Sequence, residues 1–251
     1  MHSIGGWLAL AGVLVIGPRV GRFSDDGTPR PIFGHNLTLL TLGGFILWFG
    51  WFGFNAGSSL AVDANIGLIA LNTHLAAISA VVGYLLITKL FGKPVLLTES
   101  VNASLTGLVA ITAGCAFMSP MFAIITGLIG AVVYVASSSL LLKWQVDDVV
   151  SAVAVHGFGG AWGTLAVGLF FAGDMFNPAR IGVQALGVGV GLAWGLGLGY
   201  VMYKALRLTV GLKASKLHEQ RGLDVSEHAE VGYPEFQNQL FEASTLSDKR
   251  L

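Results

Sequence analysis

Apolar residues in this chain form long runs that short polar stretches interrupt. Seven such runs are visible, and six of them reach the length of about 20 residues that an α-helix needs to cross a bilayer. The first run is shorter and ends at Gly17 and Pro18. The runs cover residues 2–17, 36–60, 65–88, 99–118, 120–142, 149–172 and 181–203. This pattern predicts an all-α polytopic membrane protein.

The composition agrees with a membrane location. Hydrophobic residues make up 54% of the chain, charged residues only 11%, and the mean hydropathy is +0.72. Soluble domains carry about 25% charged residues, so most of this surface must face lipid or other apolar helices. A formal net charge of zero gives no reason to expect a nucleic-acid partner. The single cysteine, Cys115, excludes a disulfide framework.

The basic residues predict how the segments are oriented. Of the 14 Lys and Arg residues, all but Arg180 fall in alternate connections or near the C-terminus. Positive residues favour the cytoplasmic side, so the 18–35 loop and the C-terminal end are expected there. We therefore expect a membrane domain at 1–210 and a cytoplasmic tail at 211–251, the tail with one short helix. The basic residues on the cytoplasmic side are Arg19, Arg22, Arg30, Lys89, Lys93, Lys143, Lys204, Arg207, Lys213, Lys216, Arg221, Lys249 and Arg250.

A short pattern, His-x-x-Gly-Gly, occurs at 2–6 and again at 156–160. Internal repeats in transporters commonly relate two halves, with the substrate path at their interface. Two neutral histidines brought together offer both a hydrogen-bond donor and an acceptor in an apolar path. Such a pair suits a small polar solute that exchanges a proton. It does not suit a metal ion, because no Cys, Asp or Glu lies at ligand spacing.

His156 is the most informative residue of the repeat. It lies inside an apolar segment, and an ionisable group at membrane depth is a functional-site hypothesis. The alternative is a structural histidine bonded to a carbonyl or hydroxyl of a neighbouring helix. The glycines that follow it allow a neighbouring helix to approach closely. The last segment has a similar glycine face, with Gly187, Gly191, Gly195 and Gly199 at a spacing of four.

The segment 45–60 combines the aromatic rings of Trp48, Phe49, Trp51, Phe52 and Phe54 with a polar outer end. Aromatic faces attract a desolvated cation by about 0.5–2 kcal/mol each, and a serine hydroxyl accepts an N–H hydrogen bond. Phe54 and Ser58 lie four residues apart on one helix face, which makes them candidates for the mouth of a path. The alternative for the rings is an aromatic belt at the membrane interface.

Other polar residues in or beside the apolar runs have structural interpretations. His74 is expected to be a structural hydrogen-bond partner, and Asn36 to cap the helix that it precedes. Asp147 and Asp148 precede the sixth segment, and carboxylates are favoured at a helix N-terminus, so we expect them to cap it. No set of nucleophile and base is evident, so an enzyme is not expected.

Several stretches together resemble the Amt branch of the Amt/Mep/Rh ammonium transporter family. They are spread over the whole chain in family order, and those around GWFGFNAGS and VHG are the most specific. The stretches are GPRVGRF (17–23), GHN (34–36), ILWFGWFGFNAGS (46–58), LNTHLAA (71–77), VDD (146–148), VHGFGGAWGTLAVGLF (155–170), LTVGL (208–212) and RGLDVSEHAE (221–230).

The resemblance implies a fold and a set of site residues. The family fold has eleven helices, an inverted five-plus-five repeat with one further helix, and forms a homotrimer with a pore in each subunit. The chain resembles the part from within the fifth helix to the C-terminus, so we expect the N-terminal helices to be missing. His2 and His156 match the twin pore histidines. Phe54 matches a gate phenylalanine, Ser58 the outer serine that binds ammonium, and Trp51 a tryptophan near the narrow path.

The implied function is ammonium transport. Ammonium is recruited at the outer mouth, gives up its proton and crosses a hydrophobic pore as ammonia, without a cofactor. The implied location is the plasma membrane, and the implied partner is a PII-type signal protein at the tail. Two alternatives remain open. The chain is a sensor or interaction protein without transport, or it is an inactive fragment.

Overall fold

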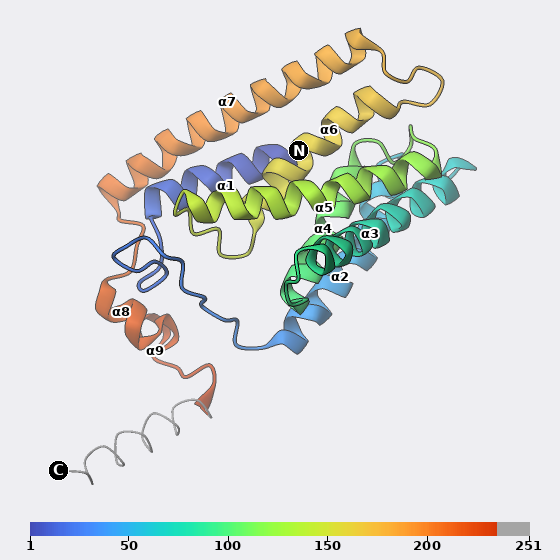
Figure 1. Cartoon of the computed structure of the whole chain (residues 1–251). Helices are drawn as coiled ribbons and strands as arrows, with labels where there is room; N and C mark the ends of the chain where they lie inside the picture. Colours follow the sequence, from blue (N-terminus) through green and yellow to red (C-terminus); the bar gives the residue numbers. More distant parts are fainter. Residues whose placement is uncertain (235–251) are drawn as a thin grey trace, which may run out of the picture. The chain divides into compact units, whose positions relative to one another are not determined.

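The structure, a computed structural model, describes residues 1–234 and is built from helices (Figure 1). The chain divides into two compact units, Met1–Gly211 and Leu212–Leu251, each of which is described by itself. The described elements of the first unit are seven α-helices and one π-helix. They are α1 (His2–Ile16), α2 (Leu37–Gly57), α3 (Asn65–Leu90), α4 (Leu97–Thr112), α5 (Pro120–Lys143), η1 (Val153–Phe158), α6 (Gly159–Phe170) and α7 (Pro178–Thr209).

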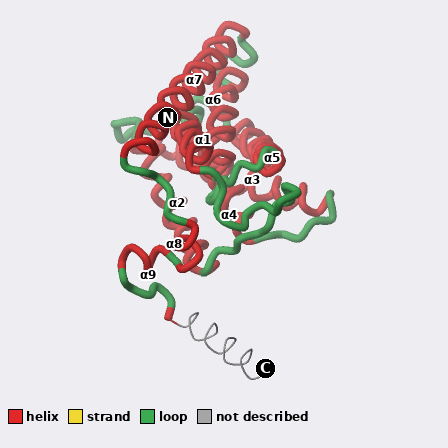
Figure 2. The backbone as a smooth tube through the Cα atoms, turned by 90° about the vertical axis from the view of Figure 1, so that its left-hand side faces the viewer, coloured by secondary structure: helices red, strands yellow, loops and turns green. Residues whose placement is uncertain are grey.

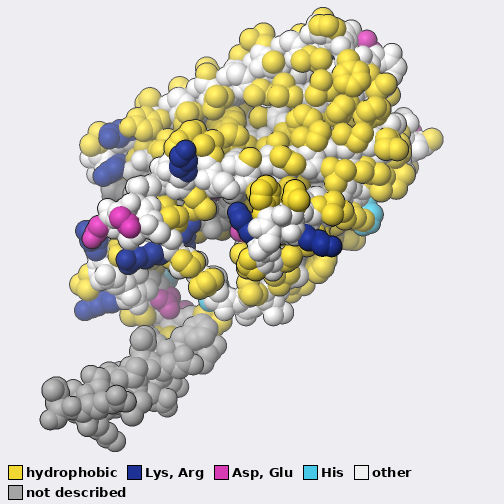
Figure 3. All heavy atoms as spheres, viewed as in Figure 1, with side chains coloured by type: hydrophobic (Ala, Val, Ile, Leu, Met, Phe, Trp, Pro, Cys, Tyr) yellow, Lys and Arg dark blue, Asp and Glu magenta, His cyan; other side chains and the backbone are white. Residues whose placement is uncertain are grey.

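Five helical stretches of the described residues are long and apolar enough to cross a membrane. They are α2, α3, α5, the continuous stretch of η1 and α6, and α7, while α1 is a shorter apolar helix. The predicted all-helical class is therefore confirmed, and the predicted segments match these elements closely. Figure 3 shows hydrophobic side chains over most of the visible face of this unit, as expected for a surface in contact with lipid.

The predicted span at 99–118 is the exception. Its helix, α4, has only 16 residues and ends at Thr112, so the expectation of a sixth long helix is wrong. The chain then turns, and the Asn72 amide donates to the carbonyls of Cys115 and Met118 at 2.9 and 2.8 Å. Ser119 is extended before Pro120, which begins α5. The prediction from apolar composition extended the span past this turn. The turn depends on the side chain of Asn72 in another helix, so the local sequence does not indicate it.

The helices of the first unit pack around α4, η1 and α6. Helix α3 lies along both α4 and α5, and α1 lies along α7 (Figures 1 and 2). Two clusters of buried apolar side chains form the core. The larger cluster contains Trp7, Trp51, Leu108, Tyr134 and Val153 among others. Because Trp51 and Tyr134 belong to this cluster, the core extends from the candidate site to the start of η1.

The glycine face of α7 packs against α1, as the sequence predicts. Gly191, Gly195 and Gly199 are its buried residues. A Cβ atom at Gly199 would lie 2.8 Å from the Leu8 side chain, so a larger residue does not fit without displacement. Gly187 differs, because a Cβ there would have no atom within 4 Å. Three of the four predicted glycines therefore form the close contact.

The backbones of α1 and η1 cross at Gly6 and Gly157. A Cβ atom at Gly6 would overlap the Gly157 backbone, and a Cβ at Gly160 would lie 2.8 Å from the backbone nitrogen of Ser3. This crossing gives a physical reason for the repeated pattern. Gly6 of the first copy and Gly160 of the second each face the helix that carries the other copy, whereas a Cβ at Gly5 would meet open space.

The described residues of the second unit form two short helices, α8 (Lys216–Arg221) and α9 (Leu223–His228). One short helix was expected, so the described part of the tail contains one more. Gly222, with a φ of 97°, separates the two helices, and this backbone conformation favours glycine. Predicted tail residues 235–251, including the basic Lys249 and Arg250, lie outside the described residues.

We expect Gly199→Val to destabilise the first unit. The new side chain must displace Leu8 and Ala11 of α1, which should lower the free energy of unfolding by roughly 1–3 kcal/mol. The measurement is thermal unfolding of the purified chain in detergent. Gly187→Val is the matched control, because it adds the same β-branched residue to the same helix in open space. Equal melting temperatures for the two variants would contradict the packing role of Gly199.

Candidate functional site

The rings of His2 and His156 face each other at the crossing of α1 and η1. Their centroids are 5.4 Å apart and their planes are inclined by 24°. The two copies of the repeat therefore bring their histidines together. His2 is the first residue of α1, and its Nε2 atom is buried without a hydrogen-bond partner. A buried nitrogen of this kind is a site at which a small polar solute can form a hydrogen bond.

Two aromatic side chains of α2 surround the His2 ring. Trp51 stacks on His2 with the centroids 5.2 Å apart, and the Phe54 centroid lies 5.6 Å from His2. The Trp51 indole N–H donates to the Thr112 hydroxyl at 2.9 Å, which fixes the plane of the indole. Thr112 was not singled out from the sequence. The available signal was a hydroxyl residue inside an otherwise apolar run.

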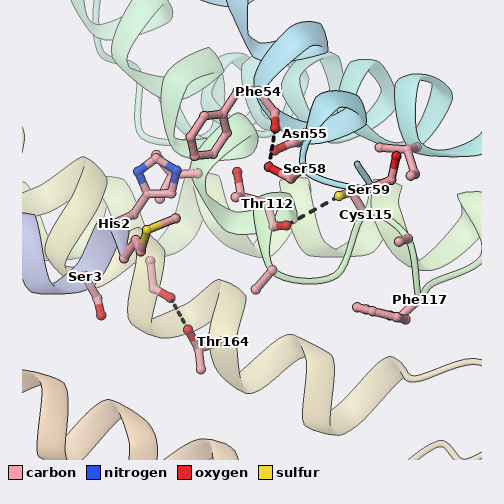
Figure 4. A pocket seen from close by; sticks show the side chains of 16 residues that line it. His2, Ser3, Phe54, Asn55, Ser58, Ser59, Thr112, Cys115, Phe117 and Thr164 are labelled. Carbon is pink, nitrogen blue, oxygen red and sulfur yellow. Dashed lines mark hydrogen bonds between the residues drawn. The ribbon is translucent and has the colours of Figure 1, made fainter. Parts of the chain in front are cut away.

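A cavity of about 380 Å³ opens beside His2 (Figure 4). His2 of α1, Phe54 and Ser58 at the end of α2 and Thr112 of α4 line it, so these three helices contribute to one space. A smaller cavity of about 250 Å³ is lined by His2, Trp51 and Phe54 on the side of α2. His2 and Phe54 line both cavities, so these two rings separate one space from the other.

Ser58 lies at the end of α2 and is exposed at the cavity. Its hydroxyl donates to the Phe54 carbonyl at 2.6 Å, which leaves its oxygen lone pairs available as acceptors (Figure 4). Asn55 also lines the cavity and is only 3% exposed. Its amide donates to Thr73, while its carbonyl oxygen has no partner. The cavity therefore combines acceptor oxygens with apolar walls.

The π-helix η1 carries His156. Such helices are rare and occur mainly as single turns at functional sites. Asp148 anchors the first turn, since its carboxylate accepts the backbone N–H groups of Val153 and Ala154 at 2.9 and 3.0 Å. The capping role predicted for Asp148 is therefore confirmed. Asn36 is likewise confirmed as the cap of α2, because its side chain accepts the Leu39 N–H.

Asp147 has a different role from the predicted cap. It forms ion pairs with Arg19 at 2.8 Å and with Arg22 at 3.1 Å. These pairs join the loop after α1 to the loop before η1, and so link the two helices that carry the histidines. Burial alone would raise the pKa of Asp147, but hydrogen bonds from Arg19 and the charges of both guanidinium groups outweigh it. The pKa of Asp147 therefore lies below its ordinary value.

His74 does not make the structural hydrogen bond that was predicted. Its exposed ring packs against Trp48 and Phe52, with centroid distances of 5.6 and 6.0 Å. The neighbouring Asn72 and Thr73 are fully buried and make the structural hydrogen bonds instead. A single turn of helix places adjacent residues on different faces, and the sequence did not reveal which of the three faced inward.

A polar network at the start of η1 was also missed. Tyr134 of α5 donates to Glu99 of α4 at 2.6 Å, and Asn102 of α4 donates to Ser151 at 3.2 Å. The four residues come from α4, from α5 and from the turn before η1, which are far apart in the sequence, so no local pattern indicated the network. No group of three or more His, Cys, Asp or Glu among the described residues could hold a metal ion.

Comparison with known proteins gives consistent relatives. Residues 1–233 match the Ammonium Transporter Family. The ammonium transporter Amt2 of Archaeoglobus fulgidus is 41% identical over 253 residues, which cover 94% of this chain and 54% of that protein. The ammonium transporter Amt2 of Methanocaldococcus jannaschii is 37% identical over 238 residues, covering 94% of this chain and 55% of that protein. The chain spans about half the length of the curated relatives that it matches.

Solved structures share the fold. A structure named Sensor Amt Protein matches with a TM-score of 0.86 and 42% sequence identity, over 90% of this chain and 57% of that one. Mep2 of Candida albicans matches with a TM-score of 0.76 and 24% identity, over 85% of this chain and 50% of that one. The second likeness concerns the fold alone.

We expect Asp147→Asn to destabilise the protein at neutral pH. Two guanidinium groups lose their anionic partner, which should cost about 1–3 kcal/mol of unfolding free energy. Because the folded pKa of Asp147 is depressed, its contribution is complete above the ordinary carboxyl pKa of about 4. The contribution is lost as the pH falls through the folded pKa. The measurement is the melting temperature in detergent between pH 7 and acidic pH, for the parent and the variant.

Asp25→Asn is the control for this experiment, because Asp25 is an exposed carboxylate of the same loop. It should leave the melting temperature unchanged at pH 7. A parent and an Asp147→Asn variant that melt at the same temperature at pH 7 would contradict the stabilising role of the ion pairs.

Proposed function

Because this chain belongs to the ammonium transporter family, we propose that it forms part of a path by which ammonium crosses a membrane. It is an integral membrane protein with several candidate spans. The observation that best supports the proposal is the stacked pair of His2 and His156, which lies beside a cavity of about 380 Å³. In this reading the repeated His-x-x-Gly-Gly pattern supplies one histidine from each of two helices.

The chemistry of the pair favours ammonia as the species that crosses. A cation in an apolar path loses its hydration, which costs far more free energy than the passage of a neutral molecule. Ammonium avoids this cost by giving up a proton, whereas potassium has no proton to give. The buried Nε2 of His2 then offers one hydrogen-bonding site to the neutral solute, and the facing ring of His156 extends the path.

Three residues of α2 are proposed to act before this step. Ser58 recruits ammonium through its hydroxyl oxygen at the outer mouth of the cavity. Phe54, which is 41% exposed and lines both cavities, acts as the gate. Trp51 provides an aromatic face for the cation and holds the His2 ring by stacking. The hydrogen bond to Thr112 keeps the indole in the orientation that this contact requires.

The setting proposed for this activity is the plasma membrane, with the C-terminal unit in the cytoplasm. The distribution of Lys and Arg supports this orientation, since Arg180 is the only basic residue on the opposite side. The membrane domain is proposed to span 1–210 and the tail 211–251. A homotrimer, with a PII-type signal protein at the tail, completes the proposal by resemblance to the family.

A sensor function is the second candidate. The structure named Sensor Amt Protein is 42% identical to this chain over 90% of its length. A sensor would bind ammonium and pass a signal to a partner with little or no flux. Transport and sensing therefore differ in one measurable quantity, the rate of uptake.

We expect His156→Ala to abolish ammonium selectivity. The substitution removes one ring of the pair and leaves His2 facing an enlarged space. The measurement is uptake of radiolabelled methylammonium, with and without excess potassium, in cells that lack their own ammonium transporters. His74→Ala is the matched control, since it removes an exposed histidine away from the pair. Unchanged uptake and unchanged exclusion of potassium in His156→Ala would reject the role of the pair.

The uptake assay should be run on two forms of the protein, each expressed separately in the same type of cell. One is this chain, and the other is this chain fused behind the N-terminal half of Amt2 from Archaeoglobus fulgidus. Uptake by either form supports transport and makes the substitution test possible. Binding of ammonium without uptake in both forms favours a sensor, and neither binding nor uptake indicates an inactive fragment.

A further inference from the structure

A chain of four polar side chains lies where η1 begins, apart from the cavities that line the proposed path. It runs from Asn102 to Ser151, then to Tyr134, and ends at the carboxylate of Glu99. The Asn102 amide donates to the Ser151 hydroxyl at 3.2 Å, and the Tyr134 hydroxyl donates to Glu99 at 2.6 Å. The Ser151 and Tyr134 hydroxyls are 3.5 Å apart. All three steps run in one donor direction when Ser151 donates to Tyr134, and such chains strengthen each of their bonds.

Tyr134 is the central residue of this network. It is fully buried, at 0% exposure, in the larger apolar cluster of the core. A tyrosine hydroxyl in such surroundings needs a partner, and the carboxyl group of Glu99 accepts its hydrogen bond at 2.6 Å. The proposed path does not use Tyr134, and its ring alone would fill the same space as phenylalanine. The hydroxyl therefore requires an explanation other than packing.

Ser151, the next residue in the network, has a strained backbone. Its φ is 56°, in the left-handed region that residues with a side chain rarely adopt. A strained residue persists only where its surroundings hold it in place. The side chain of Ser151 is held by Asn102 and by Tyr134, and its carbonyl accepts the Val155 N–H at 2.8 Å. Ser151 thus connects the polar network to the first turn of η1.

The other side of η1 is fixed by the glycine crossing. The backbone of Gly157 lies so close to Gly6 of α1 that a Cβ atom on Gly6 would overlap it. His156 is adjacent to Gly157 and five residues beyond Ser151. The position of His156 is therefore set by the backbone contact at Gly157 on one side and by the hydrogen-bonded network at Ser151 on the other. The π-helical turn between them is the geometry that satisfies both.

We propose that Tyr134 is a positioning residue for His156. Through Ser151 it holds the left-handed turn from which η1 starts, and so directs the His156 ring toward His2. Its importance for transport rests on the function proposed above, but its effect on the ring does not. Loss of the hydroxyl leaves the Ser151 side chain held by Asn102 alone, which lets the first turn of η1 relax and moves the ring away from its stacked position.

The test is ¹⁵N NMR of the histidine side chains in the purified chain, reconstituted in lipid bilayers. His156→Ala identifies the His156 resonances by their loss. We expect Tyr134→Phe to shift the His156 ring resonances, because these report the environment of each ring nitrogen. Tyr84→Phe is the matched control. Tyr84 is a buried tyrosine at 4% exposure whose hydroxyl accepts the Leu96 N–H outside the network, so its variant should leave the resonances unchanged.

Glu99 provides a second pair of variants at a half-buried position that tolerates substitution better. Glu99→Gln keeps an acceptor for Tyr134 and should retain the parent resonances. Glu99→Leu removes the acceptor and should reproduce the shift of Tyr134→Phe. If Tyr134→Phe does not fold, the comparison of Glu99→Gln with Glu99→Leu still tests the proposal. Unshifted His156 resonances in both Tyr134→Phe and Glu99→Leu would overturn the positioning role.

Uptake separates this role from the proposed function. In whichever form of the protein transports methylammonium, Tyr134→Phe should reduce the initial rate about tenfold, because a small misplacement of a reacting group has a large effect on rate. Full activity of Tyr134→Phe in a transporting form would overturn the positioning role. If Tyr134→Phe shifts the His156 resonances but neither form of the protein takes up methylammonium, the result supports the positioning of the ring. It then contradicts only the proposed transport function.

Discussion

The close crossing of α1 and η1 is the contact on which the candidate site depends. Glycine at position 6 allows the two backbones to meet at Gly157, because a Cβ atom on Gly6 would overlap the facing chain. The histidines at 2 and 156 lie next to this contact, so the separation of their rings follows from the separation of the backbones. The contact fixes the spacing of the two backbones, and the side-chain torsions of the histidines then set the orientation of the rings.

The position of helix α1 is set by contacts with its neighbours. Three contacts hold it. The glycine face of α7 receives Ile4, Trp7 and Leu8, and the guanidinium of Arg207 donates to the Val15 carbonyl at 2.7 Å. The third contact is the Asp147 ion-pair group, which joins the loop after α1 to the loop before η1. Two of these contacts act at different points along α1, and the third acts on the loop that follows it.

The sequence predicted those features that depend on local pattern. Apolar runs placed α2, α3, α5 and α7, and an asparagine before an apolar run marked the cap at Asn36. It did not predict the end of α4 at Thr112, because that turn is stabilised by the side chain of Asn72 from α3. The π-helix was also unpredictable, since it results from tertiary contacts at both of its ends. The repeat indicated the histidine pair, and the structure added its surroundings in Trp51 and Thr112.

The two histidines are held in unequal ways by their neighbours. His2 lies on α1. Its ring is held mainly by stacking on Trp51 and faces both cavities. His156 lies within η1, with Asp148 and Ser151 fixing the preceding turn and the glycine crossing fixing the next residue. The His2 ring is thus oriented by Trp51 beside the two cavities, and the His156 ring is oriented by the backbone of η1.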